Sequence, residues 1–267
     1  MYPKGFKNDL VGFSRNDKDK IGHDYEMHCH LFYEIYYFIS GDVDYMVEGK
    51  IYHPAPNSIL LLKPGAAHGV KINREDYKRY AFHFMPDIIP LEHRDILLSP
   101  FYEDNIYYEN VDLVSSFDNV LDADNLPKNI RDIAAACRFE NILTNIFILG
   151  SHKENIDQNP HSAEKIVNYL NEHLTESINL EELANIFFIS KSQLNRIFRK
   201  SMNITVGNYI SLKRIHLARQ LMLEGLSAEE AAINSGYKDY STFYRTYKKI
   251  MGYAPTQTKD HRLFNKD

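Results

Sequence analysis

Cysteine is scarce in this sequence and tryptophan is absent: Cys29 and Cys137 are the only two cysteines among 267 residues. Two cysteines cannot supply the disulfide framework of a small secreted domain, which indicates a reduced, intracellular protein. The sequence also lacks an apolar run of the ~18 residues that a membrane span needs. Its charged first 20 residues lack the apolar core of a signal peptide. We therefore expect a cytoplasmic protein without a membrane partner.

Acidic residues outnumber basic residues, 36 to 31, and the resulting net charge of −5 by itself argues against a nucleic-acid binder. The charge is divided unevenly, however. Residues 188–262 contain 13 Lys and Arg against 5 Asp and Glu, whereas residues 1–155 contain 16 against 24. A basic block carried by an acidic partner domain is typical of a specific DNA reader rather than of a general polyanion binder. The length allows two domains of ordinary size.

Residues 180–200 have the pattern of a helix, a tight turn and a second helix. Apolar residues recur at helical spacing from Leu180 to Phe187, and Ser190 stands where the N-cap of the second helix belongs. Leu194 and Phe198 face inward in that helix. Its polar residues then face outward: Ser192, Gln193, Asn195, Arg196, Arg199 and Lys200. In one isolated segment, this pattern would be interpreted as an ordinary solvated helix face.

A second copy of the pattern covers residues 227–250, and it favours the functional interpretation. A short helix over residues 228–234 leads into a turn at Gly236, and Asp239 can cap the next helix. The candidates for the outer face of that helix are Tyr240, Ser241, Tyr244, Arg245, Lys248 and Lys249. Tyr240, Ser241, Thr242 and Arg245 are expected to enter a major groove. A helix over residues 206–224 joins the two units, and it could hold two recognition helices about one DNA turn, ~34 Å, apart.

Residues from about 162 to 262 resemble the DNA-binding domain of the arabinose-regulator (AraC-type) transcription factors. The resemblance rests on Leu183, Ala184, Ser190, Leu194, Arg196, Phe198, Lys200, Tyr209, Ile210, Arg214, Ala218, Leu221, Gly236, Tyr237, Asp239, Ser241, Phe243, Arg245, Tyr247, Lys248, Lys249, Gly252 and Pro255. Phe188 and Asn203 depart from it, because each replaces a usual glycine. Asparagine, like glycine, tolerates the left-handed conformation.

The resemblance implies a transcriptional regulator that binds double-stranded DNA, is not an enzyme, and forms a homodimer. Activation is the commoner outcome in this family, and it would require RNA polymerase as a partner. Arg196 and Arg245 suit guanine through bidentate hydrogen bonds, each worth ~1–3 kcal/mol of discrimination, and Asn195 suits adenine. The phosphate or packing residues are then Arg199, Lys200, Lys213, Arg214, Lys248 and Lys249.

The first half of the sequence predicts short strands, which are typical of a sandwich or barrel. They cover residues 31–39, 43–47, 50–53, 58–62 and 79–84, after a polar arm over residues 1–20 that we expect to be partly ordered at best. A helix over residues 127–149 has an apolar stripe that includes Ile130, Ile133, Cys137, Ile142 and Ile146. The stripe covers the barrel or contacts a second subunit.

These patterns together predict an α+β chain of two domains. Residues 1–150 form a cupin-like β-barrel with a helical region, which binds ligand and forms the dimer. Residues 151–160 are a polar linker, and residues 161–267 form an all-α domain with two helix-turn-helix units.

A cluster of histidines gives the first half its best chemical site. His28, His30 and Glu34 resemble the first cupin motif, and Pro64, Gly65 and His68 resemble the second, with Ile72 in place of asparagine. Positions 28, 30, 34 and 36 would share one face of a strand. We expect a ligand pocket lined by His28, His30, Glu34, Tyr36 and His68.

The ligand is expected to be a small molecule, and a carbohydrate is favoured because relatives with this layout often sense sugars. No cofactor is expected, since similar strings occur in regulators of this family without metal. His28, His30, Glu34 and His68 nevertheless suit Zn, Mn, Fe or Ni. A metal-dependent cupin enzyme or a metal sensor fused to a DNA-binding domain is therefore the alternative.

Overall fold

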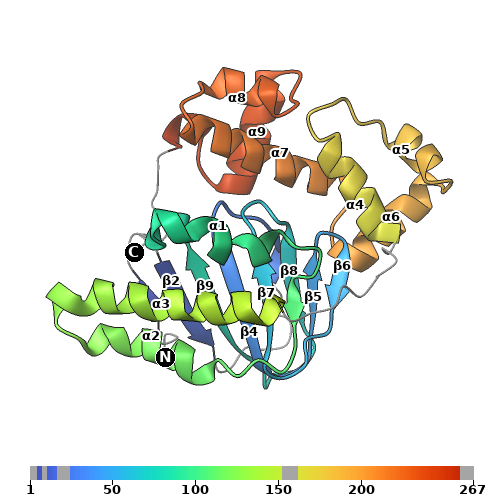
Figure 1. Ribbon diagram of the computed structural model, residues 1–267. Helices are drawn as coiled ribbons and strands as arrows, with labels where there is room; N and C mark the ends of the chain where they lie inside the picture. The colour runs from blue at the N-terminus through green and yellow to red at the C-terminus, as the bar shows by residue number, and fades with distance from the viewer. Residues whose placement is uncertain (1–4, 8–10, 17–24, 152–161, 259–267) are drawn as a thin grey trace.

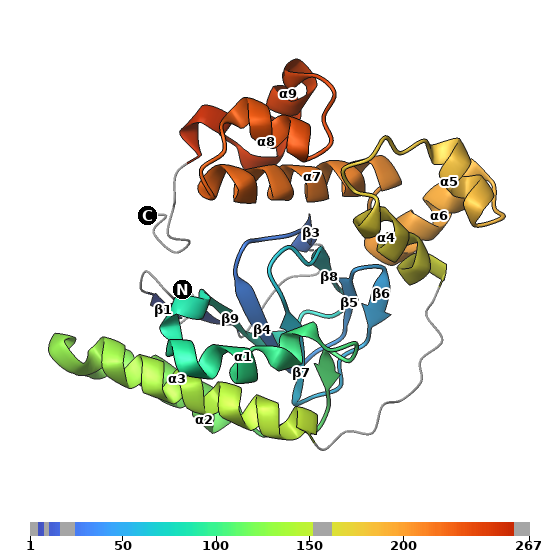
Figure 2. The same ribbon diagram turned by 45° about the horizontal axis from the view of Figure 1, so that its top comes forward.

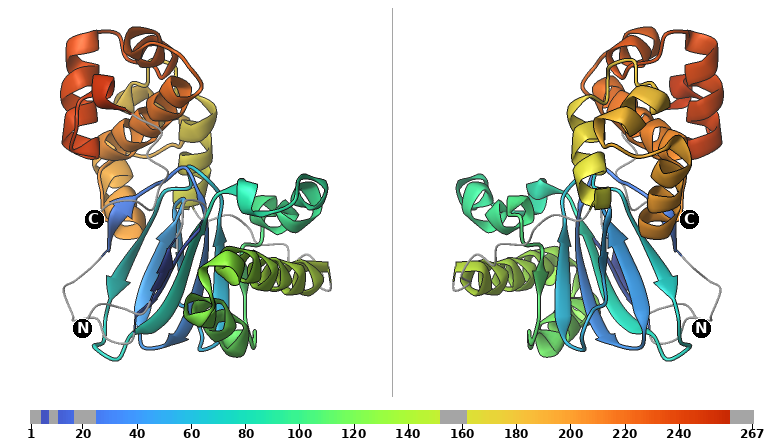
Figure 3. Two further views of the ribbon diagram at one scale, coloured as in Figure 1. Left: turned by 90° about the vertical axis from the view of Figure 1, so that its left-hand side faces the viewer. Right: turned by 90° about the vertical axis from the view of Figure 1, so that its right-hand side faces the viewer.

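The computed structural model describes residues 5–7, 11–16, 25–151 and 162–258. The first half contains two β-sheets with helices on one side, and the second half is helical (Figure 1). Figure 3 shows the helices of the first half beside the sheets and those of the second half at one end of them. The predicted linker at 151–160 lies outside the described residues, apart from Ser151.

Two antiparallel sheets form the first half. The larger sheet has the order β1 (Gly5–Lys7), β2 (Val11–Asn16), β9 (Lys78–Phe84), β4 (Tyr33–Ser40), β7 (Ser58–Leu62) and β10 (Tyr107–Tyr108). The smaller sheet has the order β3 (Tyr25–His28), β8 (His68–Ile72), β5 (Val43–Val47) and β6 (Lys50–Tyr52). A core of aromatic and aliphatic side chains lies between them.

Strand β4 is apolar on both faces because both faces are covered. Tyr36 and Phe38 point into the core between the sheets, whereas Ile35 and Tyr37 join a second core under the helices. This explains the continuous aromatic run in the sequence, where a half-solvated strand would alternate with polar residues.

The strands predicted at residues 43–47 and 50–53 are present as β5 and β6, and they form a hairpin. Its two turn residues, Glu48 and Gly49, have φ of 44° and 86°, as a two-residue hairpin turn requires. Within the N-terminal arm, which was expected to be partly ordered at best, residues 11–16 form a strand. Strand β2 pairs with residues 79–84 of β9, and Phe13 is buried with its ring centroid 3.9 Å from that of Phe82. Burying this aromatic ring fixes the segment to the sheet.

Helices cover the outer face of the larger sheet: α1 (Arg94–Leu97), α2 (Val114–Asp122) and α3 (Lys128–Ser151), with short 3-10 turns Pro86–Ile88, Leu91–His93, Ser99–Tyr102 and Ala123–Asn125. The predicted stripe of α3 was right at Ile142 and Ile146, which are buried. Ile130, Ile133 and Cys137 are exposed, so they do not cover the sheet, and their contact with a second subunit stays a prediction. They are exposed because the N-terminal end of α3 extends past the sheet (Figure 1).

Residues Lys128–Gly150 of α3 are also long and apolar enough to cross a membrane, judged by length and composition alone. In this fold one side of the helix packs on the larger sheet. Phe139 lies 5.0 Å from Phe82 and 4.7 Å from Phe84, measured between ring centroids. The apolar character of α3 therefore matches its place over an aromatic core.

The second half consists of α4 (Ser162–Glu172), α5 (Leu180–Ile186), α6 (Lys191–Met202), α7 (Val206–Leu223), α8 (Ala228–Asn234) and α9 (Tyr240–Met251), followed by the 3-10 turn Pro255–Gln257. Helix α7 runs through both helix-turn-helix units (Figure 2). Its first half packs with Leu194 and Phe198 of α6, and its second half packs with Phe243 and Tyr247 of α9. One helix therefore contributes to both cores.

Candidate nucleic-acid interface and ligand site

Helix α6 is held by a cap at its start and by buried residues on one side. The Ser190 hydroxyl accepts a hydrogen bond from the Gln193 N–H at 3.2 Å, and the Gln193 side-chain oxygen accepts one from the Ser190 N–H at 2.9 Å. This confirms the predicted cap. Leu194 and Phe198 are fully buried. The other face is polar and solvent-accessible, and it carries Ser192, Gln193, Asn195, Arg196, Arg199 and Lys200.

Helix α9 repeats this arrangement in the second unit. The Asp239 carboxylate accepts a hydrogen bond from the Thr242 N–H at 2.8 Å, which confirms the second predicted cap. Phe243 and Tyr247 are buried. Ser241, Thr242, Arg245 and Lys248 are exposed, whereas Tyr240 is half-buried against the Phe243 ring.

The exposed faces of α6 and α9 are the predicted DNA-reading surfaces, and both are basic. Arg196 makes no ion pair with any residue that the structure describes, so its guanidinium is available to an outside partner. The amide of Gln193 is less available, because its oxygen already caps α6. Lys213, predicted as a phosphate or packing residue, points instead toward the ligand-binding half, where it contacts Glu48.

The predicted histidine cluster is present, but it is built differently from the expectation. His28 ends β3 in the smaller sheet, and β4 of the larger sheet begins only at Tyr33. The idea that His28, His30 and Glu34 share the face of one strand was therefore wrong. The chain crosses from one sheet to the other between them, and this corner brings the side chains together.

Glu34 lies at the centre of the cluster. Its Oε2 is 3.0 Å from Nε2 of His30, 3.2 Å from Nε2 of His68 and 3.4 Å from Nε2 of His83. Sequence reasoning missed His83. It lies on β9 directly opposite Glu34 in the strand register, which no local motif indicates.

In three histidines of the cluster, the Nδ1 nitrogen faces a backbone carbonyl. The Nδ1 atoms of His28, His30 and His68 lie 2.8, 2.9 and 2.9 Å from carbonyl oxygens of Glu26, Phe32 and Ala66. A neutral ring that donates from Nδ1 presents a bare lone pair at Nε2, and this is the tautomer that binds metal. Nε2 of His68 is buried and faces the Glu34 carboxylate at 3.2 Å.

Electrostatics favour neutral rings around an ionised carboxylate. Burial lowers the pKa of His30 to about 4 and also lowers the pKa of His28. Burial raises the pKa of Glu34, but the proximity of the His83, His30 and His68 rings outweighs burial and holds that pKa well below its usual range. Imidazole nitrogens and a carboxylate are suitable ligands for a divalent transition metal. The ligand atoms form two groups, each within 4.8 Å: one from His28, His30 and His68, and one from His30, Glu34 and His83.

Tyr36, the fifth predicted ligand residue, lies outside this cluster. Its ring is buried between the sheets, 4.4 Å from that of Tyr45. Phe32, in contrast, stacks on the His30 ring at 3.8 Å.

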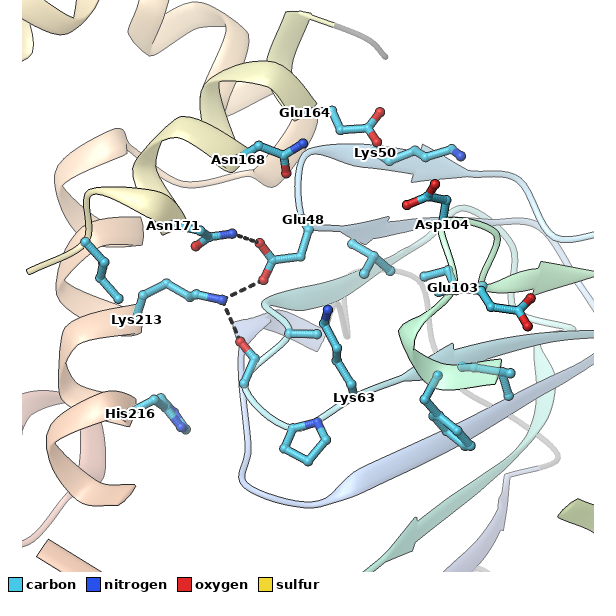
Figure 4. Close-up of a pocket in the computed structure, with 18 of the residues that line it drawn as sticks. Glu48, Lys50, Lys63, Glu103, Asp104, Glu164, Asn168, Asn171, Lys213 and His216 are labelled. Atoms are coloured by element: carbon cyan, nitrogen blue, oxygen red, sulfur yellow. Dashed lines mark hydrogen bonds and ion pairs between the residues drawn. The ribbon is translucent and has the colours of Figure 1, made fainter. Parts of the chain in front are cut away.

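A cavity of about 380 Å³ lies between the two halves of the chain (Figure 4). Its walls come from the β5–β6 hairpin and the 63–66 loop on one side and from α4 and α7 on the other. None of the five predicted ligand residues lines it. We call this space the junction cavity.

Glu48, in the hairpin turn, joins the two halves beside this cavity. Its carboxylate accepts hydrogen bonds from the Tyr209 hydroxyl at 2.6 Å, the Lys213 ammonium at 2.8 Å and the Asn171 amide at 2.9 Å. Burial raises the pKa of Glu48, but Lys213 and these hydrogen bonds outweigh it, so the group is held ionised. Sequence reasoning missed this contact, because its members are distant in the chain.

Apolar contact reinforces the junction. Cys29 is buried with residues of the α4–α7 core, and burial raises the pKa of its thiol. At Gly49 a Cβ would lie 3.0 Å from the backbone of Ala163, so the close approach of the hairpin to α4 requires glycine.

Two protein families match this chain. Residues 183–261 match a helix-turn-helix domain, and residues 10–143 match the AraC-like ligand binding domain. Together they include both helix-turn-helix units, the histidine cluster and Glu48.

Relatives agree with this assignment. The probable transcriptional regulator LumQ of Photobacterium leiognathi is 32% identical over 93 residues, which are 34% of this chain and 38% of LumQ. The uncharacterized HTH-type transcriptional regulator YbfI of Bacillus subtilis is 23% identical over 223 residues, 80% of this chain and 79% of YbfI. The match to LumQ thus covers well under half of that protein.

Among solved structures, ToxT from Vibrio cholerae O395 matches over 92% of this chain and 95% of its own, with 16% identity and a TM-score of 0.39. Since one family accounts for the first half and the helix-turn-helix match accounts for the second, the chain belongs to the AraC family of DNA-binding transcriptional regulators.

Proposed function

We propose that this regulator reads its operator through α6 and α9 and that a small molecule bound by its first half controls that binding. The observation that carries the proposal is the pair of capped helices with exposed basic faces, built on the shared helix α7. Phosphate contacts from such faces supply affinity, and base contacts supply specificity. Residues 1–150 and 161–267 are the two domains in this scheme.

Base reading falls to the residues that are both exposed and not needed for capping. Arg196 on α6 and Arg245 on α9 reach base edges, with Ser192, Ser241 and Thr242 beside them. Asn195 is half-buried and its amide donates to the Lys191 carbonyl at 3.2 Å, so it reads a base by exchanging that hydrogen bond. Arg199, Lys200 and Lys248 contact phosphates. Gln193 and Tyr240 contribute less, because one caps α6 and the other packs on Phe243.

Selection of bound sequences from a random double-stranded DNA library tests the proposal. The full chain should enrich two short half-sites about one helical turn apart, and binding measured by fluorescence anisotropy should weaken steeply with salt. Recovery of no enriched sequence at low salt would contradict it.

The finer assignments belong to the same proposal. The regulator acts in the cytoplasm as a homodimer, more often as an activator that contacts RNA polymerase, and a carbohydrate is the favoured effector. Exposed Ile130, Ile133 and Ile148 on α3 support the dimer, because large apolar side chains on the solvent side of this helix are available to a second subunit.

The histidine cluster supports a second candidate, a regulator that responds to a divalent transition metal. His28, His30 and His68 would hold the ion, with Glu34 and His83 completing the donor set. A bound ion would accept the lone pairs of the imidazole nitrogens and would offset the negative charge of Glu34. It would also hold together the segment in which the chain crosses from β3 to β4. The anchoring of each Nδ1 on a carbonyl orients the rings for this role.

Cobalt titration separates the two candidates. Stoichiometric binding with a visible absorption band of tetrahedral or five-coordinate Co²⁺, lost in His68→Ala and kept in His53→Ala, would support the metal candidate. His53 is a suitable control because it is exposed and lies outside the cluster. No binding at micromolar cobalt would leave the cluster as a structural network and remove this candidate.

A further inference from the structure

The junction cavity has walls from both domains, so a molecule bound there contacts both. Lys63 and Tyr52 line it from the ligand-binding domain, and Asn168 and His216 line it from α4 and α7. Figure 4 shows Lys63 between the strands and α7, with Glu48 and Lys213 beside it. Its volume of about 380 Å³ lies in the lower range of small-molecule sites.

Glu48 is an anchor of this cavity rather than a group that awaits a ligand. One carboxylate oxygen accepts from the Ala67 N–H at 2.6 Å and from Lys213 at 2.8 Å. The other accepts from Tyr209 at 2.6 Å and from Asn171 at 2.9 Å. These four donors satisfy the carboxylate, so it is not expected to bind an additional group.

Lys213 is an anchor in the same way. Besides Glu48, its ammonium donates to the Gly65 carbonyl at 2.7 Å. Both acceptors belong to the ligand-binding domain, so one side chain of α7 fixes the hairpin and the 63–66 loop together. The distance between the cavity walls therefore depends on this contact.

The remaining lining indicates the class of ligand. Beyond the Glu48–Lys213 pair, two lysines (Lys50 and Lys63) face three carboxylates (Glu103, Asp104 and Glu164). A strongly anionic or cationic molecule would meet charge of its own sign on one wall. A neutral molecule with many hydroxyl groups can donate to the carboxylates and accept from the ammonium groups at once.

His216 supplies a further polar group inside the cavity. Its side chain is 8% exposed, and its Nδ1 has no hydrogen-bond partner within the described residues. A buried polar atom without a partner is uncommon in a folded protein. A ligand hydroxyl at this place would provide one.

We propose that the junction cavity is the effector site of this regulator and that it takes a neutral, hydroxyl-rich molecule of about monosaccharide size. The inference rests on the proposed function, because it names the site and class of the effector. Binding there stabilises the domain arrangement in which Lys213 contacts Glu48, since only that arrangement brings both walls to the ligand.

The experiment uses the full chain and a defined panel: D-glucose, D-galactose, D-xylose, L-arabinose and myo-inositol. Binding is measured by isothermal titration calorimetry for the parent, Asn168→Trp and Lys165→Trp. Asn168 lines the cavity, whereas Lys165 is exposed on the same helix and does not. At least one compound should bind the parent and Lys165→Trp equally, and Asn168→Trp should lose at least tenfold in affinity.

Equal affinity in Asn168→Trp and the parent would place the effector elsewhere and overturn the site. Binding of no member of the panel would overturn the ligand class. DNA binding by the same preparations separates this inference from the proposed function. Specific DNA binding without any sugar effect contradicts the inference alone, whereas absence of specific DNA binding contradicts the proposed function.

Discussion

Phe188 and Gly236 occupy equivalent positions in the two helix-turn-helix units, and both have a left-handed backbone, with φ of 55° and 90°. Each is the second residue after the first helix of its unit. Their surroundings differ. A Cβ at Gly236 would lie 2.8 Å from the Thr175 carbonyl oxygen, whereas the Phe188 side chain is 97% exposed. The turn of the first unit therefore has room for the Phe188 side chain, but the left-handed backbone at Phe188 remains strained.

We expect Phe188→Gly to stabilise the protein by about 1 kcal/mol, because a non-glycine residue in the left-handed region is destabilised by roughly 1–2 kcal/mol. The exposed ring contributes little packing in compensation. Urea unfolding at neutral pH measures the change. Phe188→Ala, which keeps a Cβ in the left-handed region, should not stabilise, and a lower midpoint for Phe188→Gly than for the parent would show that the ring has a packing role.

Arg196→Ala should weaken operator binding by about 1–3 kcal/mol and relax the preference at one base pair, because it removes a bidentate base contact. Lys248→Ala should weaken all sequences about equally and lower the salt dependence by about one phosphate contact. Anisotropy titrations on the selected operator and on scrambled DNA measure both. Normal operator binding by Arg196→Ala would refute the assigned register of α6.

Glu48→Gln should destabilise the domain junction by roughly 1.5–3 kcal/mol at pH 7, because it removes the charged acceptor of Lys213, Tyr209 and Asn171. The folded-state pKa of Glu48 lies below its unfolded value. Its ionised form therefore contributes stability above about pH 4.5, and this contribution is lost as the pH falls through the folded value. Scanning calorimetry should show the difference between parent and variant shrinking in acid. A difference that stays constant from pH 7 to pH 3 would contradict the role of the charge.

Ile133→Arg should weaken dimer formation, because it places a charge in the exposed apolar surface of α3. Ile233→Arg is the matched control, since Ile233 is an isoleucine of similar exposure on α8. Light scattering coupled to gel filtration should give a monomer for the first variant and a dimer for the second at the same concentration. A dimer for both would move the interface away from α3.

The helical domain was predictable because its signals are local. Ser190 and Asp239 cap the helices that begin one residue later, and α8 has the predicted bounds Ala228–Asn234. Each signal depends on neighbours within one or two turns of the chain. The hairpin turn at Glu48 and Gly49 was predictable for the same reason.

The ligand-binding domain was less predictable because its sites form between distant segments. His83 joins Glu34 only through the pairing of β4 with β9. Lys213 contacts Glu48 across 165 positions in the sequence. Burial on α3 depends on how far the helix extends past the sheet, so its periodicity could not distinguish Ile133 from Ile142. The cluster of His28, His30, Glu34 and His68 was found by motif, although the strand assumed for it does not exist.

Helix α7 makes the protein sensitive to the rotational phase of its operator. Tyr209 belongs to the core of the first unit and Ala218 to that of the second, and both lie on one unbroken helix. Adding about 5 base pairs between the half-sites turns one of them to the far side of the duplex, and adding about 10 restores the side but not the distance. Because Lys213 lies between these two residues, a change at the junction cavity that displaced α7 would carry both helix-turn-helix units as one body and leave their spacing unchanged.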